Sequence, residues 1–213
     1  MAVWALIGFM GCGKSSIGRL VASLSDIQFI DLDDVITSRT GRSIPDIFRS
    51  AGEAGFRAIE RETLSDILVG ATRQAGFCPP SEGRVNPPGR GCRGLEHPFR
   101  APSEILISLG GGTLTDAESR EMVRKNCKCI YLRASVQELA KNLREDGAAA
   151  GRPMLAGADP DAPADAPDSL ESRISAMMAV RGPIYEKAAD IILDIDGLDY
   201  SDVAQQILNS FSL

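Results

Sequence analysis

Residues 8–16, GFMGCGKSS, constrain the fold of this chain more than any other stretch. They fit the pattern G-x-x-x-x-G-K-[ST], with the apolar run AVWALI before them and the amphipathic run SSIGRLVASL after them. Glycine lets such a loop turn so that successive backbone N–H groups point at phosphate oxygens, and the N-terminal end of the next helix adds positive charge. A strand, a phosphate loop and a helix are therefore predicted in this order, and a bare glycine turn is the weaker interpretation.

Each polar side chain of this loop has a predicted task. We expect Lys14 to reach the β and γ phosphates of a nucleoside triphosphate from an exposed position, and the Ser15 hydroxyl to ligate Mg²⁺. Cys12 occupies a variable position of the pattern, where a filler role is favoured over a thiol acidified by the helix end. The chain lacks the N-K-x-D motif of guanine-reading GTPases, so the nucleotide is predicted to be ATP, used by a kinase or an ATPase.

Apolar β-like runs alternate with helical patterns along the rest of the chain. Strands are predicted at residues 3–8, 28–30, 105–109, 128–132 and 191–193. Helices are predicted at residues 14–24, 43–50, 53–69, 117–125, 136–144, 170–188 and 201–211. Strands that alternate with helices form a parallel sheet covered on both faces, and 213 residues suffice for one such α/β domain.

Composition narrows the class of protein further. Acidic residues outnumber basic ones by 29 to 23, which argues against a nucleic-acid partner, and the longest apolar runs are too short to cross a bilayer. Five cysteines, with no basic segment before the first apolar run, favour a cytoplasmic protein with reduced thiols. The single histidine, His97, lies in a Pro/Gly/Arg-rich stretch, so a general base in the core is expected to be a carboxylate.

Two segments do not fit a packed core. Residues 71–103 are rich in Pro, Gly and Arg and show no periodicity, which predicts a surface insertion. Cys78, Cys92 and His97 fall inside it, but their spacing does not suit a zinc site. Residues 156–169, AGADPDAPADAPDS, predict an extended and negatively charged linker.

Two carboxylates are candidates for the site where the phosphoryl acceptor binds. Asp31 and Asp33 lie two apart in FIDLDDVI, so on a strand end both would face the same side. One can hold Mg²⁺ through water, while the other can orient an acceptor hydroxyl and take its proton. A pair of solvated turn aspartates, with Asp34 beginning a helix, explains these residues equally well when they are taken alone.

A helical pattern further along the chain carries an arginine between two glutamates. Glu53, Arg57 and Glu60 lie along one face of the predicted helix. They form either a surface ladder of ion pairs or an arginine that its flanking glutamates hold in position to bind an anionic group of a substrate.

Taken in order, these motifs resemble those of the shikimate kinases, small P-loop kinases that phosphorylate the 3-hydroxyl of shikimate with ATP. The matching pieces are GFMGCGKSSIGRLVA, DLDDVITSRTGRSIPDIFRSAGEAGFRAIERETL, SLGGGTLT, GRPML and RGPIYEKAAD. Each piece is modest alone, but the ordered set is specific and covers nearly all of the chain outside the two odd segments. The resemblance implies a three-layer P-loop NTPase fold, with a five-stranded parallel sheet of order 2-3-1-4-5 and a mobile lid.

The resemblance also implies a role for each matching residue. The ATP phosphates would be wrapped by Gly11, Cys12, Gly13, Lys14, Ser15 and Ser16, with Ser15 and Asp31 at Mg²⁺. Shikimate would be held by Asp33, Arg57, Gly110, Gly111, Gly112 and Arg181. Asp33 would be the base, and the two arginines would clamp the carboxylate. Arg152 in GRPML would close from the lid onto the transferring phosphoryl group, so that Lys14, Asp33 and Arg152 form the catalytic set.

The whole chain, residues 1–213, is thus expected to be a single kinase domain and a monomer, with substrate-binding helices at residues 33–70 and a lid at residues 145–173. It departs from the family in the insertion at residues 71–103 and in a longer, acidic lid. The stretch DIDGLDY also offers no clear equivalent of the arginine that some relatives place against adenine. A gluconate-type kinase and a non-catalytic P-loop nucleotide-binding module remain alternatives.

Overall fold

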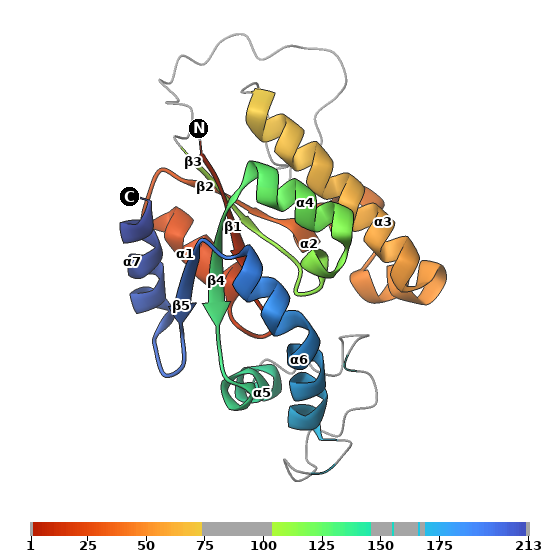
Figure 1. Cartoon of the computed structure of the whole chain (residues 1–213). Helices are drawn as coiled ribbons and strands as arrows, with labels where there is room; N and C mark the ends of the chain where they lie inside the picture. Colours follow the sequence, from red (N-terminus) through yellow and green to blue (C-terminus); the bar gives the residue numbers. More distant parts are fainter. Residues whose placement is uncertain (1, 74–103, 146–154, 156–165, 167–168, 212–213) are drawn as a thin grey trace.

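Five parallel strands form the centre of the structure, a computed structural model that describes residues 2–73, 104–145, 155, 166 and 169–211 (Figure 1). The strands are β1 (Ala2–Ile7), β2 (Gln28–Asp31), β3 (Glu104–Ser108), β4 (Lys128–Arg133) and β5 (Ile191–Asp194). They pair in the order β2-β3-β1-β4-β5. This confirms the predicted α/β class and sheet order. Each observed strand begins and ends within one residue of its predicted bounds.

β1 occupies the middle of the sheet and is its most buried strand. Trp4 pairs with Leu106 of β3 on one side and with Lys128 of β4 on the other. Residues 3–7 are all buried, since helices cover both faces of the sheet. A parallel strand buried on both faces needs a continuous apolar run rather than an alternating one, which explains the sequence AVWALI.

The helices divide between the two faces of the sheet. They are α1 (Lys14–Ser23), α2 (Leu32–Thr40), α3 (Ile44–Arg73), α4 (Ala117–Asn126), α5 (Val136–Glu145), α6 (Leu170–Ala188) and α7 (Tyr200–Ser210), with a short 3₁₀ turn η1 (Thr113–Thr115). α1 and α7 pack together on one face, and α3, α4 and α6 lie on the other (Figure 1). Right-handed crossovers require this division, because the connection from β1 to β2 runs one way along the sheet and the three later connections run the other way.

The second and third helices show where local sequence decides the fold. The predicted break between two helices falls at Gly52, where φ is 67° and ψ is −176°, a conformation that glycine adopts far more readily than other residues. The α3 segments on either side of Gly52 correspond to the predicted helices at residues 43–50 and 53–69. The separate helix α2 begins directly after β2, with Asp31 as its N-cap.

Several sequence predictions fall on residues that the structure does not describe. α3 extends to Arg73, past residue 71, at which we placed the start of the insertion. Residues 74–103, with Cys78, Cys92 and His97, lie outside the described ranges, and so does most of the lid at residues 145–173. Within the described ranges, no helix has the length and apolar character needed to span a membrane.

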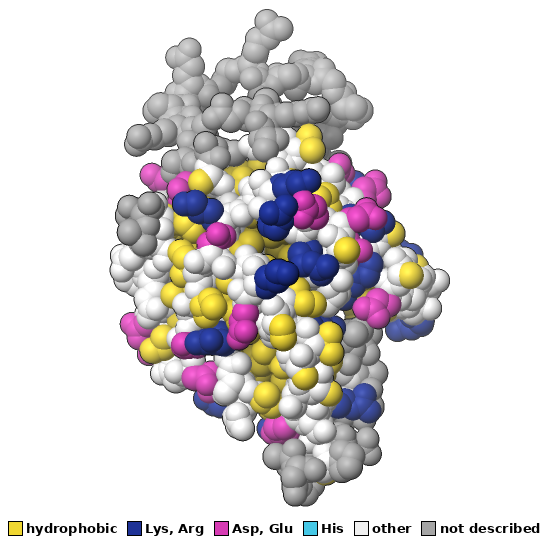
Figure 2. Space-filling view, viewed as in Figure 1, with side chains coloured by type: hydrophobic (Ala, Val, Ile, Leu, Met, Phe, Trp, Pro, Cys, Tyr) yellow, Lys and Arg dark blue, Asp and Glu magenta, His cyan; other side chains and the backbone are white. Residues whose placement is uncertain are grey.

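Charged side chains of both signs are interspersed on the face that carries α3, α4 and α6 (Figure 2). On α4, Glu121 pairs with Arg124 at 2.9 Å and with Lys125 at 3.1 Å. Hydrogen bonds from these two side chains lower the pKa of the Glu121 carboxyl to about 2. Exposed pairs of this kind add little to stability, so the buried apolar core holds the layers together.

The helix cap at Asp116 gives a direct test of local stabilisation. Its carboxylate accepts hydrogen bonds from the Ser119 N–H and the Ser119 hydroxyl, both at 2.8 Å, at the start of α4. Asp116→Ala is therefore expected to lower the free energy of unfolding by about 1 kcal/mol. Asp199 is the N-cap of α7 but makes no side-chain cap bond there, so Asp199→Ala is the matched control. Equal losses for the two variants in urea unfolding would contradict the prediction.

The same cap should depend on pH in a defined direction. Burial raises the pKa of Asp116, but the Ser119 hydrogen bonds and the charges of Arg61 and Arg57 outweigh it and hold the pKa below its usual 3.8. The contribution of the cap is then fully present above the pKa of the unfolded chain and is lost as the pH falls through the lower folded value. The difference in stability between the unmodified chain and Asp116→Ala should shrink accordingly in acid.

Candidate active site

The loop after β1 has the backbone that a phosphate site needs. Gly8, Gly11 and Gly13 have φ values of 143°, 82° and 82°, in the region that side-chain-bearing residues rarely adopt. Gly13 is the N-cap of α1, and no side chain among the described residues caps this helix. The first N–H groups of α1, at Lys14, Ser15 and Ser16, therefore point out of the helix end, where an anion would bind.

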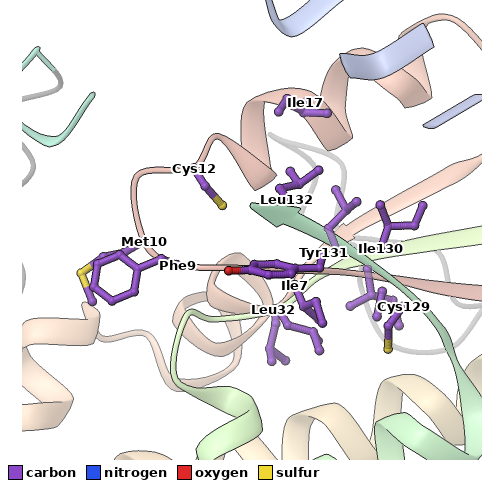
Figure 3. Close-up of a cluster of buried hydrophobic side chains, with 14 of the residues drawn as sticks. Ile7, Phe9, Met10, Cys12, Ile17, Leu32, Cys129, Ile130, Tyr131 and Leu132 are labelled. Carbon is purple, nitrogen blue, oxygen red and sulfur yellow. The ribbon is translucent and has the colours of Figure 1, made fainter. Parts of the chain in front are cut away.

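Two side chains of this loop, the ammonium group of Lys14 and the thiol of Cys12, turn inward. Lys14 is only 8% exposed, and its Nζ donates hydrogen bonds to the carbonyl oxygens of Gly8 at 2.9 Å and Phe9 at 2.8 Å. The expectation of an exposed Lys14 is wrong, because the loop folds around its own lysine. Cys12 is fully buried and its side chain points toward the core (Figure 3), as expected of a filler.

Only the first of the two aspartates lies on the strand end, because Asp33 falls in the first turn of α2. β2 ends at Asp31 and α2 begins at Leu32, so the period of two that would place both side chains on one side does not apply. Instead, the Asp31 carboxylate accepts a hydrogen bond of 3.0 Å from the Asp33 N–H. Both residues nevertheless remain at the carboxyl end of the sheet, since Asp31 is buried against it and Asp33 lies beside Gly110.

Arg57 is part of a buried ion pair. Its Nη1 lies 2.6 Å from Oε2 of Glu60, a residue that is only 1% exposed, and its Nη2 lies 3.4 Å from Glu53. The other Glu60 oxygen accepts a 2.6 Å hydrogen bond from the Thr113 hydroxyl. The geometry is that of an arginine held by flanking glutamates rather than that of an exposed ladder, and the binding of an anionic substrate group by Arg57 stays a prediction.

The glycine triplet after β3 fits between these groups. A Cβ atom at Gly110 would lie 2.7 Å from the Glu60 carboxylate and 3.4 Å from that of Asp33. A Cβ atom at Gly112 would lie 2.1 Å from Nη2 of Arg57. The absence of side chains here lets the backbone approach Asp33 and Arg57 closely, and a third glycine, Gly111, faces the phosphate loop at Met10.

α6 completes this arrangement with two side chains on one face. Arg181 is 6% exposed and donates a 3.3 Å hydrogen bond to the Gly111 carbonyl, which also accepts a hydrogen bond from the Tyr185 hydroxyl. Burial raises the pKa of Tyr185 well above its usual range, so the phenol stays protonated and can donate. Arg181 is one of the predicted site residues and Tyr185 is not, although its position four residues later on the same helix predicts the same face.

Some of the predicted site residues lie close together in the structure, and another falls outside the described residues. Asp33, Arg57, Arg181 and the glycine triplet meet at the carboxyl ends of β2 and β3, next to the phosphate loop. Arg152 lies outside the described residues. The gathered set holds one buried arginine, one partly buried arginine and one carboxylate beside a phosphate loop, which suits a kinase that phosphorylates a small anionic acceptor.

Comparisons with known proteins agree with this class. A family model described as shikimate kinase matches residues 10–72 and 97–212. A shikimate kinase of Stenotrophomonas maltophilia (strain R551-3) is 34% identical over 203 residues, which cover 95% of this chain and 88% of that protein. One from Bordetella pertussis is 31% identical over the same share of this chain and 75% of its own length.

Solved structures show the same likeness in three dimensions. A shikimate kinase from Acinetobacter baumannii in complex with shikimate aligns with a TM-score of 0.73 and 25% identity, over 99% of this chain and 93% of that one. The shikimate kinase from Bacteroides thetaiotaomicron gives a TM-score of 0.72 at 25% identity, over 100% of this chain and 99% of that one. The chain belongs to the shikimate kinase family, whose members transfer a phosphoryl group from ATP to a hydroxyl of shikimate.

The close approach at Gly112 makes a sharp prediction for the acceptor side. Gly112 has φ −115°, which alanine adopts without strain, so Gly112→Ala should act only through the methyl group that displaces Arg57. We expect the KM for the acceptor to rise by about tenfold or more, and the melting temperature to fall because the Arg57–Glu60 pair is disturbed. Gly70→Ala is the control, because a Cβ atom there meets nothing within 4 Å. Steady-state kinetics that show the same acceptor KM for both variants would contradict the prediction.

Proposed function

We propose that this chain phosphorylates the 3-hydroxyl of shikimate with ATP, giving 3-phosphoshikimate and ADP. The observation that carries the proposal is that two arginines meet the glycine triplet, the partly buried Arg57 at Gly112 and the buried Arg181 at the Gly111 carbonyl. An acceptor with one carboxylate and a ring of hydroxyls fits this arrangement, and the similar protein from Acinetobacter baumannii was solved with shikimate bound.

On the acceptor side, binding and proton transfer fall to different side chains. Arg57 and Arg181 would clamp the carboxylate, because a planar guanidinium can give two parallel hydrogen bonds to two carboxylate oxygens. Glu60 holds Nη1 of Arg57 at 2.6 Å, which fixes the guanidinium before the substrate arrives. Asp33 would accept a hydrogen bond from the reacting hydroxyl and take its proton as the bond to phosphorus forms.

On the phosphate side, the loop after β1 would hold the donor. The N–H groups at the start of α1 would bind the phosphate oxygens of ATP, and Lys14 would exchange its carbonyl partners for the β and γ phosphates. Arg152, carried by GRPML, would neutralise charge on the transferring group. The protein is asked for little covalent chemistry, since positioning and charge neutralisation supply most of the acceleration.

Mg²⁺ fits the donor set at this end of the sheet. Mg²⁺ at a phosphoryl-transfer site takes one or two protein oxygens and fills its other positions with phosphate and water oxygens. The Ser15 hydroxyl, exposed in the first turn of α1, and the Asp31 carboxylate at the end of β2 offer such oxygens. When bound, the ion would neutralise charge on the β and γ phosphates. A monomeric state and a cytoplasmic location remain predictions.

A coupled assay of ADP release tests the proposal directly. Shikimate, gluconate and quinate are offered side by side at equal concentration with ATP and Mg²⁺. We expect turnover with shikimate to exceed that with the other two acids by orders of magnitude. Faster turnover with gluconate would favour a gluconate-type kinase, and nucleotide binding without turnover on any acid would favour a non-catalytic nucleotide-binding module.

Asp33 provides the matching test of mechanism. Asp33→Asn keeps the shape of the side chain but removes the proton acceptor, so kcat should fall by about 10²- to 10⁴-fold, while the affinity for ADP changes little. Asp34→Asn is the control, because Asp34 is exposed and pairs with Arg19 at 2.6 Å. If Asp33→Asn instead weakens ADP binding and leaves kcat intact, Asp33 belongs to the nucleotide side of the site.

A further inference from the structure

The phosphate loop is supported from outside by a helix far away in the sequence. Nδ2 of Asn142, on α5, donates a 3.0 Å hydrogen bond to the carbonyl oxygen of Gly11. The same helix packs tightly on this glycine, because a Cβ atom at Gly11 would lie 2.9 Å from Cγ of Leu143 and 3.4 Å from the Leu139 carbonyl. Gly11 therefore has no space for a side chain and no freedom to move toward α5.

These contacts fix one peptide plane of the loop at both of its ends. The plane between Gly11 and Cys12 presents its carbonyl oxygen to Asn142, and its N–H donates to the Phe9 carbonyl at 3.4 Å. Because Asn142 holds the Gly11 carbonyl outward, this oxygen cannot turn into the phosphate-binding loop, where it would repel phosphate oxygens. The longer of the two bonds is the internal one, so Asn142 is the stronger restraint on this plane.

α5 is itself rigidly placed, which a restraint of this kind requires. Leu139, Ala140 and Leu143 are buried in the core. At the end of the helix, the Arg144 guanidinium forms a two-bond fork with Glu171 of α6, at 2.8 and 3.0 Å. Hydrogen bonding to Arg144 holds the pKa of the Glu171 carboxyl below its usual range. α5 thus joins the phosphate loop to α6, the helix that carries Arg181.

We propose that Asn142 is a positioning residue for nucleotide binding, acting through the Gly11 carbonyl to keep the phosphate cradle open in the absence of ligand. It does not contact the phosphates. The role of Asn142 depends on the proposed function only for the identity of the nucleotide, which is ATP. A loop that is already in its binding conformation loses no affinity to rearrangement, so loss of this restraint should weaken nucleotide binding specifically.

The test compares variants that differ in a single hydrogen-bond donor. Asn142→Leu keeps the branching and the number of heavy atoms of the side chain but removes the donor, and the dissociation constant for Mg·ADP should rise by about three- to tenfold, the effect of one lost hydrogen bond. Asn142→Gln keeps the donor and should recover part of that loss. Gln137→Ala removes an amide from the exposed face of the same helix and should leave nucleotide affinity unchanged.

Two further measurements separate positioning from general structural damage. The KM for shikimate at saturating ATP and the melting temperature should stay near the values of the unmodified chain in Asn142→Leu. Unchanged Mg·ADP affinity in Asn142→Leu would overturn the inference, and so would equal losses in nucleotide affinity, acceptor KM and melting temperature. Because Mg·ADP binding is measured without turnover, this result does not depend on whether the unmodified chain phosphorylates shikimate.

Discussion

The parallel pairing of β1 with β3 is the interaction on which the candidate site depends. Leu6 pairs with Ser108, and the Leu109 N–H continues the ladder by donating to the Leu6 carbonyl at 3.1 Å. The loops that follow β1 and β3 therefore begin at the same level along the strand direction, at the carboxyl edge of the sheet. This places the Gly111 backbone beside Met10, so strand pairing itself brings the phosphate loop and the glycine triplet together.

The buried pair of Arg57 and Glu60 has a cost that its function explains. Two charges removed from water stabilise a fold less than their attraction suggests, because each loses its hydration. The arrangement reduces this cost by giving Glu60 a second donor in the Thr113 hydroxyl. Arg57 keeps one unsatisfied atom, since its buried Nε has no hydrogen-bond partner among the described residues. An arginine with unused donors in a buried site is suited to an anionic ligand that enters later.

The elements of the fold could be predicted from periodicity, but the contacts between them could not. Strand positions followed from short apolar runs bounded by glycine or polar residues, and the break at Gly52 followed from a glycine between two helical patterns. The transition from β2 into α2 carries neither glycine nor proline at its boundary, so the strand period was extended wrongly to Asp33. The burial of Lys14 depends on carbonyl groups of its own loop, which no side-chain pattern encodes.

Contacts between distant residues show the same limit more strongly. Asn142 is separated from Gly11 by 131 residues, and nothing in the sequence around either residue links the two. Tyr185 is an intermediate case, since its spacing from Arg181 indicates a shared helix face but not what that face meets. The resemblance to a family supplied the residues proposed to touch ligands, whereas the contacts that hold these residues in place became visible only in the folded chain.

The inward position of Lys14 has a consequence for which anions the free protein can retain. The ammonium group already has two neutral acceptors, the carbonyl oxygens of Gly8 and Phe9, so a ligand must displace them to reach it. A chloride ion or a carboxylate carries a single negative charge, which must replace two short hydrogen bonds of the ammonium group. A polyphosphate carries more negative charge, spread over several oxygens that can accept hydrogen bonds. If Lys14 binds the phosphates as proposed, the carbonyl groups of its own loop compete with every anion for this ammonium group, and they are displaced more readily by a polyphosphate than by a small anion.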